Sequence, residues 1–183
     1  MNKQPALPVA VKSESVSAFL SLAEQYCATI ERHEDYSDLE FLQLMDTLLP
    51  LLYVKVQGLP DLDVPKRNRT VSVQDTTNQY FETSYPLREK LGKHDAYREV
   101  YDPYSDEDAV TATLSDDLSD IYVNLKQGLV RYYEGQSSAM ARAIWDLKLN
   151  FTIHWGEHAT GALRAIHSLL HTHYDEDDEV FDI

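Results

Sequence analysis

The chain has 183 residues, of which 43% are hydrophobic and 26% charged, so it can bury the core of one globular domain without disulfides or metals. Its 31 acidic and 16 basic residues give a formal net charge of -15. A field of that sign repels nucleic-acid phosphates and anionic lipid headgroups, so we expect no nucleic-acid partner. The single cysteine, Cys27, excludes an internal disulfide.

Apolar runs are short throughout the sequence. The longest, Leu48–Val54, is far shorter than the roughly 20 residues of a membrane-spanning helix. Near the N-terminus, the run Ala6–Val11 is interrupted by Pro8 and is too short for a secretory signal peptide. We therefore expect no membrane partner and a cytoplasmic location.

Two helices are predicted after a loose N-terminal lead, residues 1–14, which contains two prolines. Apolar residues recur at three- and four-residue steps over residues 15–34, which predicts an amphipathic helix. Ser37 and Glu40 have the spacing of a capping box and predict the start of a second helix. Pro50 lies inside that helix and is expected to kink or split it, because proline lacks an amide hydrogen.

The middle of the chain, residues 59–112, carries weaker signals. A polar loop is expected to about Asp75, followed by a third helix within residues 77–91 that Pro86 interrupts. Five tyrosines fall within residues 80–104. We interpret them as amphipathic packing residues with their hydroxyls near solvent.

The strongest helical patterns come last. A fourth helix carries Asp116 and Asp117 in its first turn, where carboxylates suit the positive end of the helix dipole, and Gly135 is expected to stop it. After a short connection, apolar residues recur on one face from Met140 to Leu169 and predict a long fifth helix.

These elements predict the domain organisation. Residues 15–172 are expected to form a single all-α domain, a bundle-like arrangement of about five main helices with little or no sheet. The loose lead, residues 1–14, precedes it. Residues 173–183 form an acidic tail that we interpret as mobile, because a block of like charges is usually solvated.

Histidines concentrate near the C-terminus. His154 and His158 lie one turn apart on the apolar face of the fifth helix. Such a pair can hold a metal ion, or it can consist of buried neutral imidazoles with hydrogen-bond partners, and both interpretations stay open. With Glu157 the segment also matches the H-x-x-E-H motif of inverted zinc peptidases. The short remainder of the chain leaves little room for the third, acidic ligand of such an enzyme.

Asp117 is the carboxylate expected nearest to these histidines. If the fourth and fifth helices pair antiparallel about residue 136, Asp117 lies level with Trp155 and beside His154. A carboxylate there would orient the imidazole and raise its pKa. The pair is then either a functional site or a structural polar clasp. Glycine-rich phosphate loops, GxSxG and Cys-x-x-Cys motifs are missing, and we expect no cofactor.

Several further motifs follow one another along the chain. They are Ser37 to Pro60, Leu91–Asp95 with Tyr101–Pro103, Leu114–Tyr122, and His154–His158 with Ala162–His167. In this order they resemble a bacterial family named domain of unknown function 5063, over roughly residues 16–170. The resemblance implies a helical domain and no particular activity, cofactor or substrate. It also implies a candidate pocket of signature positions: Asp117, Asp120, His154, Trp155, His158 and Arg164.

Two classes of function are compatible with the sequence. We favour a non-catalytic cytoplasmic interaction module that presents an acidic surface to a protein partner, which the sequence does not identify. The alternative is a small metal-binding protein or enzyme that uses His154, His158 and Asp117. Neither composition nor motifs determine the substrate or the oligomeric state.

Overall fold

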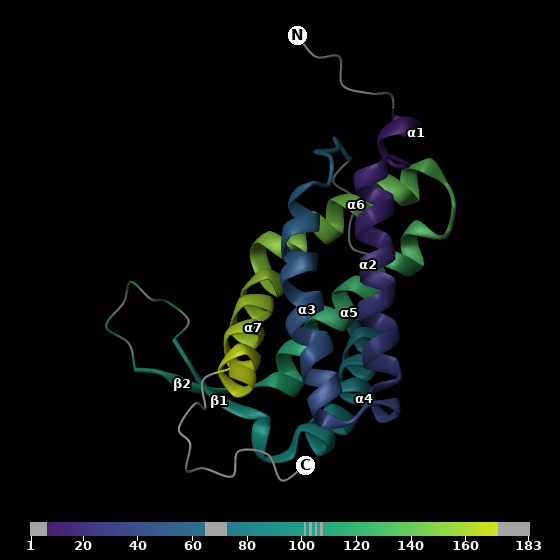
Figure 1. Cartoon of the computed structure of the whole chain (residues 1–183). Helices are drawn as coiled ribbons and strands as arrows, with labels where there is room; N and C mark the ends of the chain where they lie inside the picture. The colour runs from purple at the N-terminus through teal and green to yellow at the C-terminus, as the bar shows by residue number, and fades with distance from the viewer. Residues whose placement is uncertain are drawn as a thin grey trace.

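Helices make up most of the structure, a computed structural model that describes residues 7–64, 73–100, 102, 104, 106 and 108–171. The α-helices are α1 (Leu7–Ala10), α2 (Glu14–Glu31), α3 (Asp38–Gln57), α4 (Val73–Leu91), α5 (Leu114–Tyr132), α6 (Ser137–Asn150) and α7 (Gly156–His171). Three short segments join or interrupt them: η1 (His33–Asp35), η2 (Gly92–His94) and the π-helix η3 (Phe151–Trp155). Because α6, η3 and α7 follow one another without a break, they form the long fifth helix, beside α2, α3, α4 and α5 (Figure 1). The predicted all-α, bundle-like fold with five main helices is confirmed.

Capping residues explain where the helices begin and end. At α3, Ser37 Oγ accepts the Glu40 N–H at 3.3 Å while the Glu40 carboxylate accepts the Ser37 N–H at 2.9 Å, so the predicted capping box is confirmed. At α5, Thr113 Oγ1 accepts the Asp116 N–H at 3.3 Å. Beyond the end of α5, Gly135 has a φ of 80°, a conformation that glycine adopts without strain.

Proline inside a helix does not divide it in this structure. α3 runs unbroken through Pro50, and α4 runs unbroken through Pro86 from Val73. The expected interruption at Pro86 is therefore wrong, and of the kink or split expected at Pro50, the split does not occur. Each proline removes one backbone hydrogen bond, and the burial of an amphipathic face stabilises the helix enough to offset that loss.

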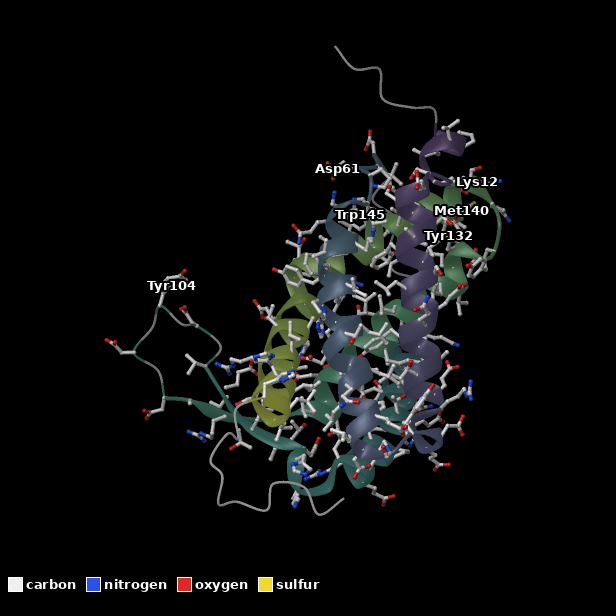
Figure 2. The ribbon with its side chains drawn as sticks, in the orientation of Figure 1. Lys12, Asp61, Tyr104, Tyr132, Met140 and Trp145 are labelled. Carbon is white, nitrogen blue, oxygen red and sulfur yellow. The ribbon has the colours of Figure 1, made fainter. Side chains whose placement is uncertain are left out.

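The segment before α2 contacts the end of α5. Val11 is fully buried, and its carbonyl oxygen accepts the Tyr132 hydroxyl at 2.9 Å. Lys12, the next residue, lies at the same end of the molecule as Tyr132 (Figure 2). This part of the expected loose lead is thus packed on the domain. Residues 1–6 and the acidic tail, residues 173–183, lie outside the described residues.

The core lies between α2, α3, α4, α5, α6 and α7. Its largest fully buried side chains include Trp155, Tyr26 and Phe19, and each such burial stabilises the fold by roughly 1.5–3 kcal/mol. The Tyr26 hydroxyl is satisfied by the Leu118 carbonyl oxygen at 2.9 Å. Among the described residues, no helix combines the length and the apolar character that crossing a membrane requires.

A small antiparallel hairpin is attached to the start of α5. Its strands are β1 (Ala96–Glu99) and β2 (Val110–Thr113) (Figure 1), and Tyr104, which is 97% exposed, lies away from the helices (Figure 2). At the base of the hairpin, the buried Asp95 carboxylate accepts the Ser115 N–H at 2.8 Å. The hairpin is the sheet found in the described part of the chain, in agreement with the expectation of little or no sheet.

Candidate functional site

Asp117 is the centre of a polar cluster at the start of α5. The residue is only 3% exposed. One carboxylate oxygen lies 2.7 Å from His158 Nδ1, and the other accepts the Tyr97 hydroxyl at 2.6 Å. Because an ionised carboxylate only accepts hydrogen bonds, Nδ1 of His158 carries the hydrogen. An unpaired buried carboxylate is costly, and these two bonds offset the cost of its burial.

Tyr97 reaches this carboxylate because β1 lies very close to α7. Side chains alternate along β1, and Tyr97 and Glu99 share its half-buried face. A Cβ atom at Gly161 of α7 would lie 2.7 Å from the Tyr97 hydroxyl and closer still to Glu99 Oε1. Glycine at position 161 therefore permits the approach. Burial and the hydrogen bond to Asp117 raise the pKa of Tyr97, so its hydroxyl stays protonated and donates.

Two more side chains extend the cluster from Asp117 toward solvent. His158 Nε2 lies 3.6 Å from Asp120 Oδ2, and the rings of His154 and His158 are 4.9 Å apart between centroids. One ligand atom from each of Asp120, His154 and His158 lies within 4.8 Å of the others. His154 is exposed and the other two are partly buried, so the cluster opens to solvent at His154.

The carboxylates change the proton affinity of His158. Burial alone would lower its pKa, but the hydrogen bond to Asp117 and the negative charges of Asp120, Asp117 and Glu99 outweigh burial and raise it. Asp120 shows the complementary behaviour. Burial raises its pKa, although His158 and His154 act in the opposite direction. His158 therefore binds a proton more tightly in this cluster than a histidine free in water does.

The imidazole beside Asp117 belongs to His158, so the expected pairing of Asp117 with His154 is wrong. That expectation counted equal numbers of residues from position 136 along both helices. The π-helix η3, which contains His154, places more residues in each turn and shifts later residues back toward its start. Helical side chains also lean toward the N-terminus of their own helix, in opposite directions on antiparallel helices. Both effects move the partner of Asp117 further along α7.

The structure separates the remaining predicted positions from the cluster. Trp155 is fully buried in the core, and its indole N–H donates to the Leu147 carbonyl oxygen at 3.3 Å. Arg164 is exposed and donates to the Arg98 carbonyl oxygen at 3.1 Å, which fastens β1 to α7. Glu157, the base that a zinc peptidase would need, is exposed. Of the six predicted pocket residues, the structure brings four together: Asp117, Asp120, His154 and His158.

Sequence reasoning missed the contribution of the hairpin. The tyrosine-rich stretch was the one signal for it, and a four-residue strand is too short for alternation to be recognised. The residues missed in the cluster are Tyr97, Glu99 and Gly161. A second histidine pair on α7, His167 and His171, was also missed as a ligand set. Their ligand atoms lie within 4.8 Å of one another and of a carboxylate oxygen of Asp46 on α3.

Comparison with known proteins places the chain in a family. The model of the family described as domain of unknown function (DUF5063) matches residues 10–172. The chain belongs to this family. The resemblance found in the motifs is thereby confirmed. The matched residues of the DUF5063 domain include every residue of the cluster around Asp117.

A solved structure shares the fold of this DUF5063 domain. It is the crystal structure of protein BF1032 from Bacteroides fragilis, which superposes with a TM-score of 0.75 at 24% sequence identity. The similarity covers 88% of this chain and 95% of that one. No curated protein matches the chain. These comparisons establish the fold and the family.

Proposed function

We propose that this domain binds a divalent first-row transition metal ion through His154, His158 and Asp120. The observation that carries the proposal is the hydrogen bond between Asp117 and His158 Nδ1, 2.7 Å long and buried on the carboxylate side. Histidines that ligate metals almost always donate their other ring N–H to a carboxylate, a carbonyl or water. Asp117 supplies that partner, and Tyr97 in turn holds Asp117.

The tautomer enforced by Asp117 gives His158 the correct ligand atom. With the hydrogen on Nδ1, neutral His158 has its lone pair on Nε2, and this atom faces Asp120 at 3.6 Å. His154 is exposed, so its ring is free to rotate toward the same point. Ligand atoms bound to one ion lie about 3–3.5 Å apart at the metal–ligand distances of zinc. The separations of up to 4.8 Å therefore require side-chain rotations only.

The ligand set indicates the kind of metal. Two imidazoles and one carboxylate suit zinc and ferrous iron better than calcium or magnesium, which prefer oxygen ligands. Three protein ligands leave at least one coordination position for water or a further ligand. Because His154 is exposed, that position would face solvent. A metal bound there would polarise a water or an oxygen-bearing molecule at this open position.

The proposal revises the sequence-based alternative in one respect. Asp117, expected to orient the imidazole of His154, here orients that of His158, and the proposal adds Asp120 as a ligand. It also departs from the expectation of no cofactor. The interaction module with an acidic surface, favoured on sequence, stays a prediction alongside it.

Zinc titration of chelator-treated protein, followed by calorimetry, tests the proposal. The Asp46–His167–His171 group is a second candidate ligand set, so the titration is made in a His167→Ala/His171→Ala background. We expect one zinc ion per chain. Zinc affinity should fall at least tenfold in His154→Ala and in His158→Ala, because even the loss of a residue that only hydrogen-bonds to a metal ligand costs about tenfold or more.

The control is His33→Ala. His33 lies in η1, outside the cluster, and its Nδ1 bonds the Ile30 carbonyl oxygen. Cobalt provides a second readout, since a cobalt ion held by these ligands absorbs visible light with a spectrum that depends on its coordination. Equal zinc affinity in His154→Ala, His158→Ala and His33→Ala would refute the proposal.

A further inference from the structure

A groove lies between η2, β1 and α7, and Tyr97, which bonds Asp117, is one of its lining residues. Its volume is about 310 Å³, the lower end of the size that small-molecule sites have. Its lining includes Lys93, Tyr97, Arg98 and Arg164. No acidic residue lines it in the described part of the chain, although the sequence carries 31 acids and only 16 lysines and arginines. The groove is therefore a local exception to the negative charge of the protein.

The cations of the groove differ from most others in their pairing. Elsewhere, all described lysines and arginines except Lys12 and Lys55 make ion pairs with carboxylates, as Lys90 does with Asp38. Lys93, Arg98 and Arg164 make none with a carboxylate among the described residues. No carboxylate of the described residues therefore neutralises the charge of these three side chains.

Two of these three cations are free to bind an anion from outside. The Arg98 guanidinium is engaged by the Ala109 carbonyl oxygen and lies 3.5 Å from Thr111 Oγ1, on the β2 side. Arg164 uses one terminal nitrogen on the Arg98 carbonyl oxygen, at 3.1 Å, and retains its other N–H groups. Lys93 is exposed. A guanidinium and an ammonium that line one groove suit the oxygens of a phosphate or a carboxylate.

The groove also has an apolar component. Ala96, Ala165 and Leu169 lie among its lining residues, with the ring of Tyr97. A bare inorganic ion would leave this surface uncovered, whereas an organic anion would bury it. The combined chemistry is that of a small molecule with one oxyanion group on a short apolar body.

We infer that this groove binds a small organic oxyanion, a phosphate ester or a carboxylate, through Lys93 and Arg164. The inference does not depend on the metal site, because no metal ligand lines the groove. Tyr97 connects the two regions: its ring lines the groove and its hydroxyl bonds Asp117. A ligand in the groove would therefore lie beside the residue that positions the cluster.

Calorimetric titration of the full, chelator-treated chain with phenyl phosphate and with benzoate tests this inference. We expect saturable binding of one of them, and the tighter one identifies the oxyanion class. Inorganic phosphate should bind more weakly, because it cannot cover Ala165 and Leu169. Lys93→Gln and Arg164→Gln should each weaken binding about tenfold or more, the size expected for losing a hydrogen bond to a charged group.

Lys55→Gln is the matched control, because Lys55 is an exposed lysine on α3 outside the groove. Arg164 also bonds the backbone of β1, so Arg164→Gln can change the stability of the protein. If the melting temperature of this variant changes, Lys93→Gln alone decides whether the groove binds the anion. Binding should persist in His154→Ala, which separates this inference from the metal proposal. It would be overturned if neither organic anion bound saturably, or if Lys93→Gln bound as well as Lys55→Gln.

Discussion

Replacing Asp117 by alanine is the most direct test of the cluster. The change deletes the acceptor of two hydrogen bonds, from Tyr97 at 2.6 Å and from His158 at 2.7 Å. A hydrogen bond to a charged group contributes about 1.5–3 kcal/mol to stability. The sum must be reduced, because Tyr97 retains Glu99 at 3.0 Å and the His158 side chain is 26% exposed and can be rehydrated. We expect a loss of about 3 kcal/mol in the free energy of unfolding.

The loss should depend on pH in a defined direction. The folded pKa of His158 is raised above its unfolded value. Its protonated form therefore stabilises the fold fully below the unfolded value of about 6.5, and this contribution disappears as the pH rises through the folded pKa. Asp117→Ala removes the largest favourable contribution to that shift. The destabilisation should consequently be larger in mildly acidic than in alkaline solution.

Urea denaturation monitored by circular dichroism at both pH values measures this effect. Asp116→Ala is the matched control, since Asp116 lies in the same turn of α5 but is exposed and is bonded by Tyr80. The control loses a helix-dipole interaction and a surface bond, about 0.5–1 kcal/mol in all. Equal losses in the two variants, or a larger loss for Asp117→Ala at alkaline pH, would show that the Asp117 cluster is not the buried, charge-coupled unit described above.

Three further outcomes follow from the structure. Gly161→Ala should lower the free energy of unfolding by about 1–3 kcal/mol, because the added Cβ would clash with Tyr97 and Glu99. Gly58→Ala is the control and should be tolerated, since the nearest atom to its Cβ lies 3.4 Å away. Equal melting temperatures of the two variants would contradict this. Zinc affinity should fall as the pH is lowered through the raised pKa of His158, because a proton on Nε2 competes with the metal; calorimetry from mildly acidic to alkaline pH would show a flat profile if the site lay elsewhere. Truncation after Tyr174 should leave the melting temperature nearly unchanged in differential scanning calorimetry, and a large drop would show that the acidic tail docks.

Much of the helical framework could be predicted from the sequence because its signals are local. The capping box at Ser37 and the glycine at Gly135 each act within one turn, and both are found in the structure. The prolines misled because their local cost is outweighed by burial of the helix face, which depends on neighbours far along the chain.

The site was predictable only in part, for the same physical reason. The spacing of His154 and His158 on one helix is a local property and identified both residues. Their pairing with α5 depends on helix register, which a single π-turn changes without any sequence mark. Tyr97 arrives from a hairpin whose position is set by the absence of a side chain at Gly161, a tertiary effect that no periodicity reveals.

The parts of the cluster differ in how firmly the fold holds them. α5 and α7 are held by the core, whereas β1 is held to them by a few contacts, among them Tyr97 with Asp117 and Arg164 with the Arg98 carbonyl oxygen. Segments with few buried contacts open locally at lower free energy than the whole domain unfolds. Each such opening would break the Tyr97–Asp117 hydrogen bond and admit water to Asp117, while the helices and the bond between Asp117 and His158 stay in place. The amide hydrogens of β1 should then exchange with solvent faster than those of α5, and the cluster would switch between a clamped and a relaxed form on the time scale of hairpin opening.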